Sequence, residues 1–182
     1  KLSLDLINED PNGKKGLTLD EVTETFEEFY QGTNGTPGLC ELETLIPTRE
    51  TMEELRKLAD KVAIVTGRPR SDCDKFLKLH KLDHMIDACV CMEDGPPKPD
   101  PFPVNEACRL LGIEPSESVV LVGDTPDDIR AAIAAGCKGV GVATPEGAEE
   151  QKNLGKSFDS TKLCIAMKNC GADSILSPGF AE

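Results

Sequence analysis

The stretch VVLVGDTPDDIRAAIAA, residues 119–135, contains a predicted strand, an acidic turn and a predicted helix in direct succession. Residues 118–122 are a short run rich in β-branched apolar side chains, which is typical of a strand that is buried on both faces. Gly123 then allows the backbone to turn sharply, and the following apolar side chains recur at helical spacing until Gly136. The stretch therefore predicts a strand–turn–helix unit of an α/β domain.

Two carboxylates follow the predicted strand. Asp124 stands at its C-terminal end, and Asp128 belongs to the first turn of the predicted helix. Mg²⁺ prefers oxygen ligands and is often held by one or two carboxylates plus a phosphate, and this end of a strand is where α/β sheets bind ligands. The alternative is structural, because Thr125 and Asp127 are residues that favour a helix start. This stretch alone supports a metal site and a helix cap equally.

Composition limits the possible functions. The 182 residues are enough for one domain with an appended subdomain. They include 33 acidic and 20 basic residues, for a formal net charge of −13. This charge disfavours non-specific binding to nucleic acid or to an anionic membrane. An anionic small substrate would need a metal ion or local cations to hold it.

The 8 cysteines include no CxxC pair, and most have apolar neighbours, which predicts buried, reduced and separate thiols. We expect Cys89 and Cys91 to alternate along a strand and to point to opposite faces. The two histidines, His80 and His84, have no cysteine at zinc spacing, so no zinc site is expected. The sequence contains no signal-peptide pattern and no apolar run of membrane-spanning length. The expected location is the cytoplasm or another reducing compartment, such as an organelle stroma.

Two regions are predicted along the chain. Residues 1–47 are expected to form a separate, helical piece, with a helix that begins at a capping box of Thr18 and Glu21 and ends at Gly32. Residues 1–10 fit a helix turn or a short strand, and we favour a helix. From residue 48 onwards the pattern becomes an alternation of strands and helices. The expected strands are residues 61–65, 86–91, 119–122, 139–143 and 172–176. This order predicts a doubly wound, mostly parallel, Rossmann-like sheet with its functional groups at the C-terminal ends of the strands.

Two more segments place reactive groups at strand ends. In VTGRPRSD, a hydroxyl at Thr66 and the free backbone N–H groups around Gly67 form a combination that binds phosphate. The alternative is an ordinary turn with a helix cap at Ser71. In GPPKPDPFP, Lys98 lies among prolines that stiffen the loop and so fix the position of the ammonium group. The alternative interpretation is that Lys98 is an ordinary solvated lysine on the surface.

Together the three segments, in this order, resemble the haloacid-dehalogenase-like hydrolase superfamily, in particular its phosphatases with a helical cap, a group that includes phosphoglycolate phosphatase. VTGRPR resembles the hydroxyl motif of the family, KPDPFP its lysine motif and GDTPDDI its metal-binding motif. The resemblance covers roughly residues 47–143, and the helix from Thr18 is similar to part of the cap.

The resemblance also implies roles for individual residues. Thr66 would hydrogen-bond the transferring phosphoryl group, and Gly67 would offer a backbone N–H. Lys98 would neutralise charge on the nucleophile and on the phosphoryl oxygens. Asp124 would ligate Mg²⁺, and Asp128 would complete or support that shell. Such charge neutralisation is what transfer of a phosphoryl group requires.

The first motif of the family is absent from the sequence. That motif is an apolar strand ending in Asp-x-Asp-Gly, where the first Asp is the nucleophile and the second is the acid and base. Asp5 is a weak match, because Ile7 stands where the second Asp belongs. The stronger interpretation is that the chain begins inside the cap and lacks the first, central strand. An open slot in the sheet would then have to be filled by a segment upstream of Lys1 or by a strand from a partner.

The sequence thus predicts a Mg²⁺-dependent phosphohydrolase of small phosphorylated metabolites, which forms an aspartyl-phosphate intermediate on an Asp upstream of Lys1. The chain as given is expected to be inactive by itself. The competing hypothesis is a catalytically dead pseudophosphatase that acts as a binding or scaffold subunit of an assembly. Dehalogenation is a third and weaker alternative.

Overall fold

The computed structural model describes residues 16–33, 35–143 and 160–177. It divides into two compact units, Lys1–Thr44 and Leu45–Glu182, and each is described here by itself. The predictions for residues 1–10, including the weak match at Asp5, lie outside the described residues. None of the described helices has the length and apolar character needed to cross a membrane.

The first unit is built around helix α2, Leu19–Gln31. Its predicted capping box is confirmed: the Glu21 backbone N–H donates to Thr18 Oγ1 at 3.2 Å, and the Thr18 N–H donates to the Glu21 carboxylate at 2.8 Å. The helix ends at Gly32, whose φ of 82° is one that other residues rarely adopt. No residue of α2 is buried within the described structure, and its Phe26 and Phe29 rings are exposed. After α2 come a short antiparallel hairpin and a 3₁₀ turn: β1 Gly32–Thr33, β2 Thr36–Pro37 and η1 Leu39–Glu41.

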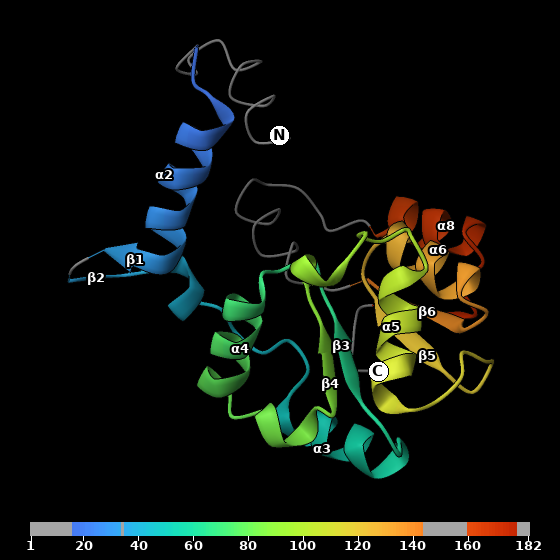
Figure 1. Ribbon diagram of the computed structural model, residues 1–182. Coiled ribbons are helices and arrows are strands. Elements are labelled where there is room, and N and C mark those ends of the chain that lie inside the picture. The colour runs from blue at the N-terminus through green and yellow to red at the C-terminus, as the bar shows by residue number, and fades with distance from the viewer. Residues whose placement is uncertain (1–15, 34, 144–159, 178–182) are drawn as a thin grey trace. The chain divides into compact units, whose positions relative to one another are not determined.

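The second unit alternates strands and helices, as the sequence predicts (Figure 1). Its strands are β3 Ala63–Val65, β4 Ala88–Val90, β5 Val120–Gly123, β6 Lys138–Val142 and β7 Ser174–Leu176. Its helices are α3 Arg49–Leu58, α4 Arg70–Leu79, α5 Phe102–Leu111, α6 Pro126–Ala134 and α8 Thr161–Asn169, with the 3₁₀ turns η2 Asp83–Met85 and η3 Met92–Asp94. Every strand pair in this unit is parallel, so the α/β class is confirmed.

The parallel strands form two sheets, β3-β4 and β5-β6-β7. Within the described residues, β3 pairs only with β4, and β5 pairs only with β6 on one side. Helix α5 connects the two sheets, because it contacts β3 and β4 and its Val104 lies in one apolar cluster with Leu121 of β5 (Figure 1). Each sheet therefore ends in a strand whose outer backbone groups have no strand partner in the described structure.

The prediction that residues 118–122 are buried on both faces is wrong for one face. Val119 and Leu121 pack into the cluster under α5, but Val120 and Val122 are 50% and 45% exposed. Side chains two residues apart in a strand share a face, so both exposed valines lie on the same side of β5. They are exposed because no other part of the described structure covers that side.

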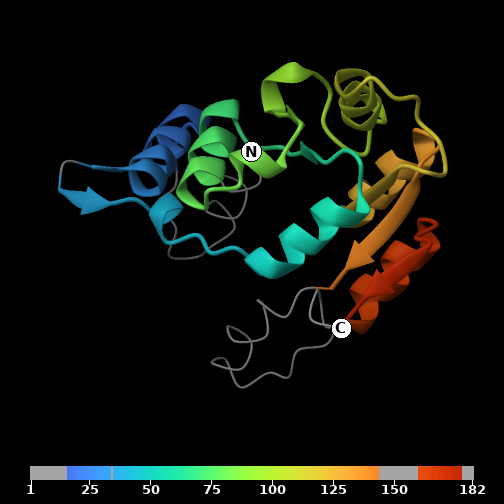
Figure 2. The same cartoon turned by 90° about the horizontal axis from the view of Figure 1, so that it is seen from below.

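Helices α6 and α8 pack on one face of β6, and the views from two directions show them side by side (Figure 2). An added methyl group at Gly139 would touch Ile129 of α6, and one at Gly141 would touch Met167 of α8. Ile129 and Met167 are fully buried. Glycines at alternate positions of β6 thus allow two helices to lie close to the strand.

Helix α4 packs on the strand β4 through a second apolar cluster, which contains Cys73, Leu77 and Cys91, with Cys89 packed against it. The prediction that Cys89 and Cys91 point to opposite faces is wrong. Residues i and i+2 of an extended chain point to the same face, and both side chains pack in or against the cluster that contains Cys73 of α4. None of the eight cysteines is in a disulfide in the described structure, but these three lie close together.

Candidate active site

The turn after β3 carries the first candidate group. The Thr66 N–H donates to Val90 O at 2.9 Å, which continues the pairing of β3 with β4 beyond the last strand residue. Thr66 Oγ1 accepts the Arg68 N–H at 3.1 Å, so the hydroxyl proton is left to donate to a ligand. Gly67 is exposed, and a side chain there would meet nothing within 4 Å. A ligand can therefore approach the Gly67 backbone closely.

A network of charged residues fixes the start of α4 beside this turn. The Arg70 N–H donates to both carboxylate oxygens of Glu93, at 3.2 and 3.1 Å. The Arg70 guanidinium donates to Asp94 Oδ2 at 2.5 Å. The alternative of a helix cap at Ser71 is wrong, because α4 begins at Arg70 and its first N–H is satisfied by Glu93. Sequence reasoning missed this network, whose only signal is the acidic pair in the loop before the prolines.

Lys98 connects the two sheets at their C-terminal ends. Its Nζ lies 2.5 Å from Asp128 Oδ1 and donates to Val65 O at 3.2 Å. The exposed fractions of the two paired side chains are 22% for Lys98 and 5% for Asp128. The alternative of a solvated surface lysine is therefore wrong. The ammonium group contacts the last residue of β3 and the first turn of α6.

Asp128 uses both carboxylate oxygens. Oδ1 faces Lys98, while Oδ2 accepts the Thr125 N–H at 3.0 Å and the Thr125 hydroxyl at 2.7 Å. Burial opposes ionisation of this carboxyl, but the hydrogen bonds from Lys98 and Thr125 outweigh burial and hold its pKa below the usual range. The helix-capping explanation of Asp128 thus holds alongside its contact with Lys98.

Gly123 is needed for this arrangement. A methyl group added at Gly123 would overlap Cβ and Cγ of Asp128. The turn after β5 therefore brings the first turn of α6 against the end of the strand, at a distance that only glycine allows.

Asp124 is exposed at the end of β5, and its carboxylate has no hydrogen bond or ion pair to other described residues. In the described ranges, no group of three or more His, Cys, Asp or Glu side chains is placed to hold a metal ion. One free carboxylate nevertheless fits Mg²⁺, which usually keeps several waters and takes only one or two protein carboxylates. Because Asp128 is committed to Lys98 and Thr125, Asp124 is the better-placed ligand of the two.

A cavity of about 330 Å³ brings part of the predicted site together. Thr66, Gly67 and Lys98 line it, together with apolar side chains that include Met92 and Phe102. Lys98 in turn holds Asp128, whereas Asp124 is not among the residues that line the cavity. The structure thus places a hydroxyl, an open backbone position and a cation around one space.

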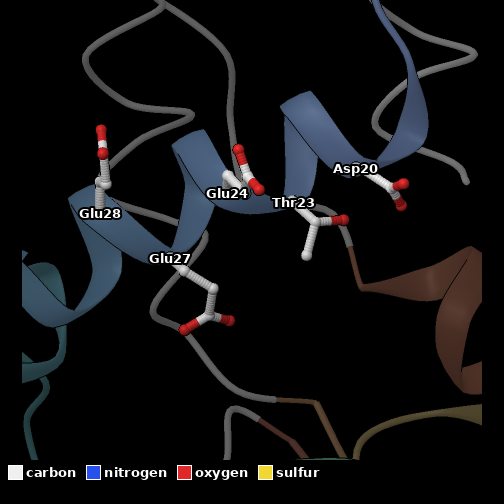
Figure 3. Close-up of a pocket in the computed structure, with 5 residues that line it drawn as sticks. All are labelled: Asp20, Thr23, Glu24, Glu27 and Glu28. Atoms are coloured by element: carbon white, nitrogen blue, oxygen red, sulfur yellow. The ribbon is translucent and has the colours of Figure 1, made fainter.

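A second hollow lies along α2 and is lined by Asp20, Thr23, Glu24, Glu27 and Glu28. Figure 3 shows that these side chains project in different directions from the helix instead of converging on one point. Its lining contains four carboxylates and no cation, so it would repel a phosphate. We do not regard it as an active-site candidate.

Comparison with known proteins shows which family the chain resembles. The sequence profile described as haloacid dehalogenase-like hydrolase matches residues 14–142. The chain is 37% identical over 124 residues to phosphoglycolate phosphatase of Haemophilus influenzae, a match that covers 67% of this chain and 53% of that protein. It is 41% identical over 169 residues to a protein named imidazoleglycerol-phosphate dehydratase from Phytophthora nicotianae, covering 91% of this chain and 36% of that protein.

Among solved structures, a predicted phosphoglycolate phosphatase from Haemophilus somnus superposes with a TM-score of 0.62 at 24% identity, covering 90% of this chain and 65% of that one. The likeness shows that the fold is the same. The chain spans about one third to one half of the length of the two curated relatives. The profile match extends over most of the chain and includes Thr66, Lys98 and Asp128, and on this basis the chain belongs to the haloacid dehalogenase-like hydrolases.

Proposed function

We propose that the whole protein is a Mg²⁺-dependent phosphohydrolase of small phosphorylated metabolites. The observation that carries this proposal is the cavity in which Thr66, Gly67 and Lys98 meet at the ends of neighbouring strands. A phosphate ester needs its equatorial oxygens neutralised and oriented during transfer, and these three groups offer a cation and two kinds of hydrogen-bond donor. The names of phosphatase relatives agree with this chemistry.

Each residue then has a defined role. The Thr66 hydroxyl, whose oxygen already accepts the Arg68 N–H, donates its proton to a phosphoryl oxygen. The Gly67 N–H donates from the open side of the turn. Lys98 lies between the phosphoryl group and Asp128, which keeps the ammonium in place. Asp128 therefore supports the site through Lys98, and Asp124 holds Mg²⁺, which supplies further neutralisation of phosphate charge when bound.

The nucleophile is proposed to be an Asp on a strand that lies between β3 and β5, from a segment upstream of Lys1 or from a partner. Three features support this proposal: the outer edges of β3 and β5 have no strand partner among the described residues, Val120 and Val122 are half exposed, and Lys98 contacts the ends of both sheets. A parallel strand in this position would pair both edges and place its C-terminal end beside the ammonium group.

The reaction then takes two balanced steps. A carboxylate oxygen of the nucleophile attacks phosphorus, and the bond between phosphorus and the ester oxygen breaks. The leaving alkoxide takes a proton from an acid on the same strand. Water next attacks phosphorus, gives its proton to that conjugate base, and displaces the carboxylate to release phosphate. The residues of the described chain bind and orient the phosphoryl group throughout.

A second candidate is a pseudophosphatase that serves as a binding or scaffold subunit. One observation favours it: the cavity lining contains no carboxylate in the described structure. In addition, the region that matches the protein named dehydratase is only 36% of that protein, so a related domain occurs there within a longer chain. The two candidates differ in a simple respect, because only the enzyme releases phosphate.

The test is release of inorganic phosphate by the natural full-length protein. We would offer phosphoglycolate and imidazoleglycerol phosphate, the esters in the names of its relatives, with Mg²⁺ and with EDTA. Mg²⁺-dependent release that is lost in Lys98→Ala supports the enzyme. Lys57→Ala is the matched control, because Lys57 forms an exposed pair with Glu54. No release from a broad set of phosphate esters, by a protein that still binds a phosphate analogue, would favour the pseudophosphatase.

We infer further that the first unit is part of a helical cap and that the protein works in a reducing compartment. The exposed apolar side chains of α2, including Phe26 and Phe29, are typical of a helix that packs against another element. The eight free cysteines, most of them buried, support the inference about compartment.

A further inference from the structure

Three cysteine side chains gather between α4 and β4. Cys73 and Cys91 belong to one buried apolar cluster, and Cys89 packs against it. Both of the other thiols affect the pKa of the Cys73 thiol, so the three lie close together. Cys73 lies in the first half of α4, Cys89 is within β4, and Cys91 directly follows that strand. All three are free thiols. The proposed phosphatase chemistry uses none of them.

Strand geometry decides which two of these thiols can form a disulfide. Cys89 and Cys91 are two residues apart on one face of an extended chain, so their Cβ atoms are about 6.6 Å apart. A disulfide needs Cβ atoms about 3.5–4.5 Å apart. A bond between Cys89 and Cys91 is therefore excluded, and Cys73 is the partner that both can reach across the α4–β4 contact.

Exposure and charge decide which thiol reacts first. Cys73 and Cys91 are 4% and 3% exposed, and burial raises the pKa of each to about 11. Cys89 is only partly buried. Burial raises the pKa of its thiol as well, but the neighbouring Cys73 and the Arg70 guanidinium oppose that rise. A thiolate therefore forms at Cys89 more readily than at the two buried positions.

We propose that Cys89 and Cys73 form a reversible oxidation site that reacts with low-molecular-weight disulfides. The Cys89 thiolate, its proton lost to solvent, attacks a sulfur of the oxidant, forms a mixed disulfide and releases one thiolate. Cys73 then loses its proton, attacks the Cys89 sulfur and expels the second thiolate. The protein gives up two electrons, which reduce one disulfide molecule to two thiols. The product links α4 to β4, and the proposal does not rest on the proposed phosphatase activity.

A second pair of neighbouring cysteines in the same protein serves as a comparison for the Cys73–Cys89 site. Cys108 and Cys137 are also neighbours, since Cys137 contributes to the raised pKa of Cys108, but the two residues are only 2% and 4% exposed. No partly exposed thiol leads into that pair. Both clusters therefore bring two thiols together. Only the cluster around Cys73 includes a partly exposed thiol, Cys89, that an oxidant can reach from solvent.

The experiment uses the full-length protein, purified with reductant and then treated with oxidised glutathione. Remaining thiols are blocked with N-ethylmaleimide before denaturation and with its deuterated form afterwards, and trypsin digestion precedes mass spectrometry without reduction. Trypsin releases Cys73 in the short peptide of residues 71–75. The other peptide, residues 82–109, contains Cys89, Cys91 and Cys108, and fragment ions distinguish the three. We expect a cross-link from Cys73 to Cys89 that dithiothreitol reverses, while Cys108 and Cys137 react only after denaturation.

Three variants test the order of the steps. Cys73→Ser should stop at a stable glutathione adduct on Cys89, Cys89→Ser should lose both adduct and cross-link, and Cys91→Ser should keep the cross-link. Cys73→Ala replaces the serine variant if circular dichroism shows that Cys73→Ser is unfolded. The proposal is overturned if the wild-type cross-link maps to Cys91, if it persists in Cys89→Ser, or if Cys108 and Cys137 oxidise as fast as Cys73 and Cys89. A wild-type protein that stays fully reduced would also overturn it.

Discussion

At the scale of single residues, the sequence predicts the groups of the site but not how they pair. The strand-end positions of Thr66 and Asp124 follow from apolar runs that stop at a polar residue, and the proline-rich sequence marks the loop of Lys98. The 2.5 Å contact between Lys98 and Asp128 does not follow, because it depends on the path of a proline-rich loop. A sequence shows that Asp128 suits a helix cap or a metal, and only the structure shows that both of its oxygens are already engaged.

The pKa of Asp128 predicts how acid affects stability. Its pKa in the folded state lies below the ordinary 3.8, so the ionised carboxylate stabilises the fold above that value, and this contribution is lost as the pH falls through the lowered pKa. Asp128→Asn should cost roughly 1–3 kcal/mol in the free energy of unfolding at pH 7. The difference from wild type should shrink below about pH 4. Thermal unfolding from pH 2 to pH 7 measures this, with the exposed Asp127→Asn as control. A difference that is constant over this pH range would contradict the prediction.

Two glycines of the site predict opposite outcomes when each is replaced by alanine. At Gly123 the new methyl group overlaps Asp128, so Gly123→Ala should destabilise the protein by about 1–3 kcal/mol, the usual cost of overpacking. At Gly67 the methyl group meets open space, so Gly67→Ala should leave stability almost unchanged and weaken the binding of a phosphate analogue. Chemical denaturation and calorimetric titration with tungstate distinguish the two. Equal loss of stability in both variants would contradict the described geometry.

At the scale of secondary structure, the alternation of strands and helices in the second unit is predictable because each element has a clear period and a clear stop signal. The strand β5 and helix α6 occupy nearly the residues expected of them, with the capping box at Thr125. Two expectations at this scale are wrong. The exposure of Val120 depends on which neighbours are present, and the faces of Cys89 and Cys91 follow from the two-residue period, which places both on one face.

The contact between α4 and β4 predicts a loss of stability in alkaline solution. Burial raises the pKa of Cys73 and Cys91 from 9.0 to about 11. Between these values the folded protein holds protons that the unfolded chain releases, so the free energy of unfolding falls as the pH rises from 9 to 11. Cys73→Ala should show a shallower fall than wild type. Urea unfolding at pH 8 to 11 under reducing conditions tests this, with Cys170→Ala, at a partly buried position, as control. An identical slope in wild type and Cys73→Ala would contradict it.

At the scale of the whole molecule, the proposed activity depends on what lies between the two parallel sheets. The described chain supplies the proposed phosphate-binding groups after β3 and in the loop before α5, but the outer edges of β3 and β5 have no strand partner there. Unpaired edges and two half-exposed valines favour the docking of a further strand. From the sequence, a further strand is predicted only because the Asp-x-Asp-Gly motif of the family is absent. Apolar patterns indicate only those strands and helices that the sequence contains.

The 182-residue chain alone should therefore not hydrolyse phosphate esters, with or without Mg²⁺, because no carboxylate in the described structure lines the cavity beside Lys98. The natural full-length protein should do so, and its Asp124→Asn variant should lose most of that turnover, because an amide is a weaker ligand for Mg²⁺ than a carboxylate. Phosphate release by the two proteins at equal concentration, with folding checked by circular dichroism, gives the comparison. Asp83→Asn is the control, because Asp83 lies in η2, remote in sequence from the site. Robust Mg²⁺-dependent turnover by the 182-residue chain would show that it carries its own nucleophile, and the proposal of a strand from elsewhere would then be wrong.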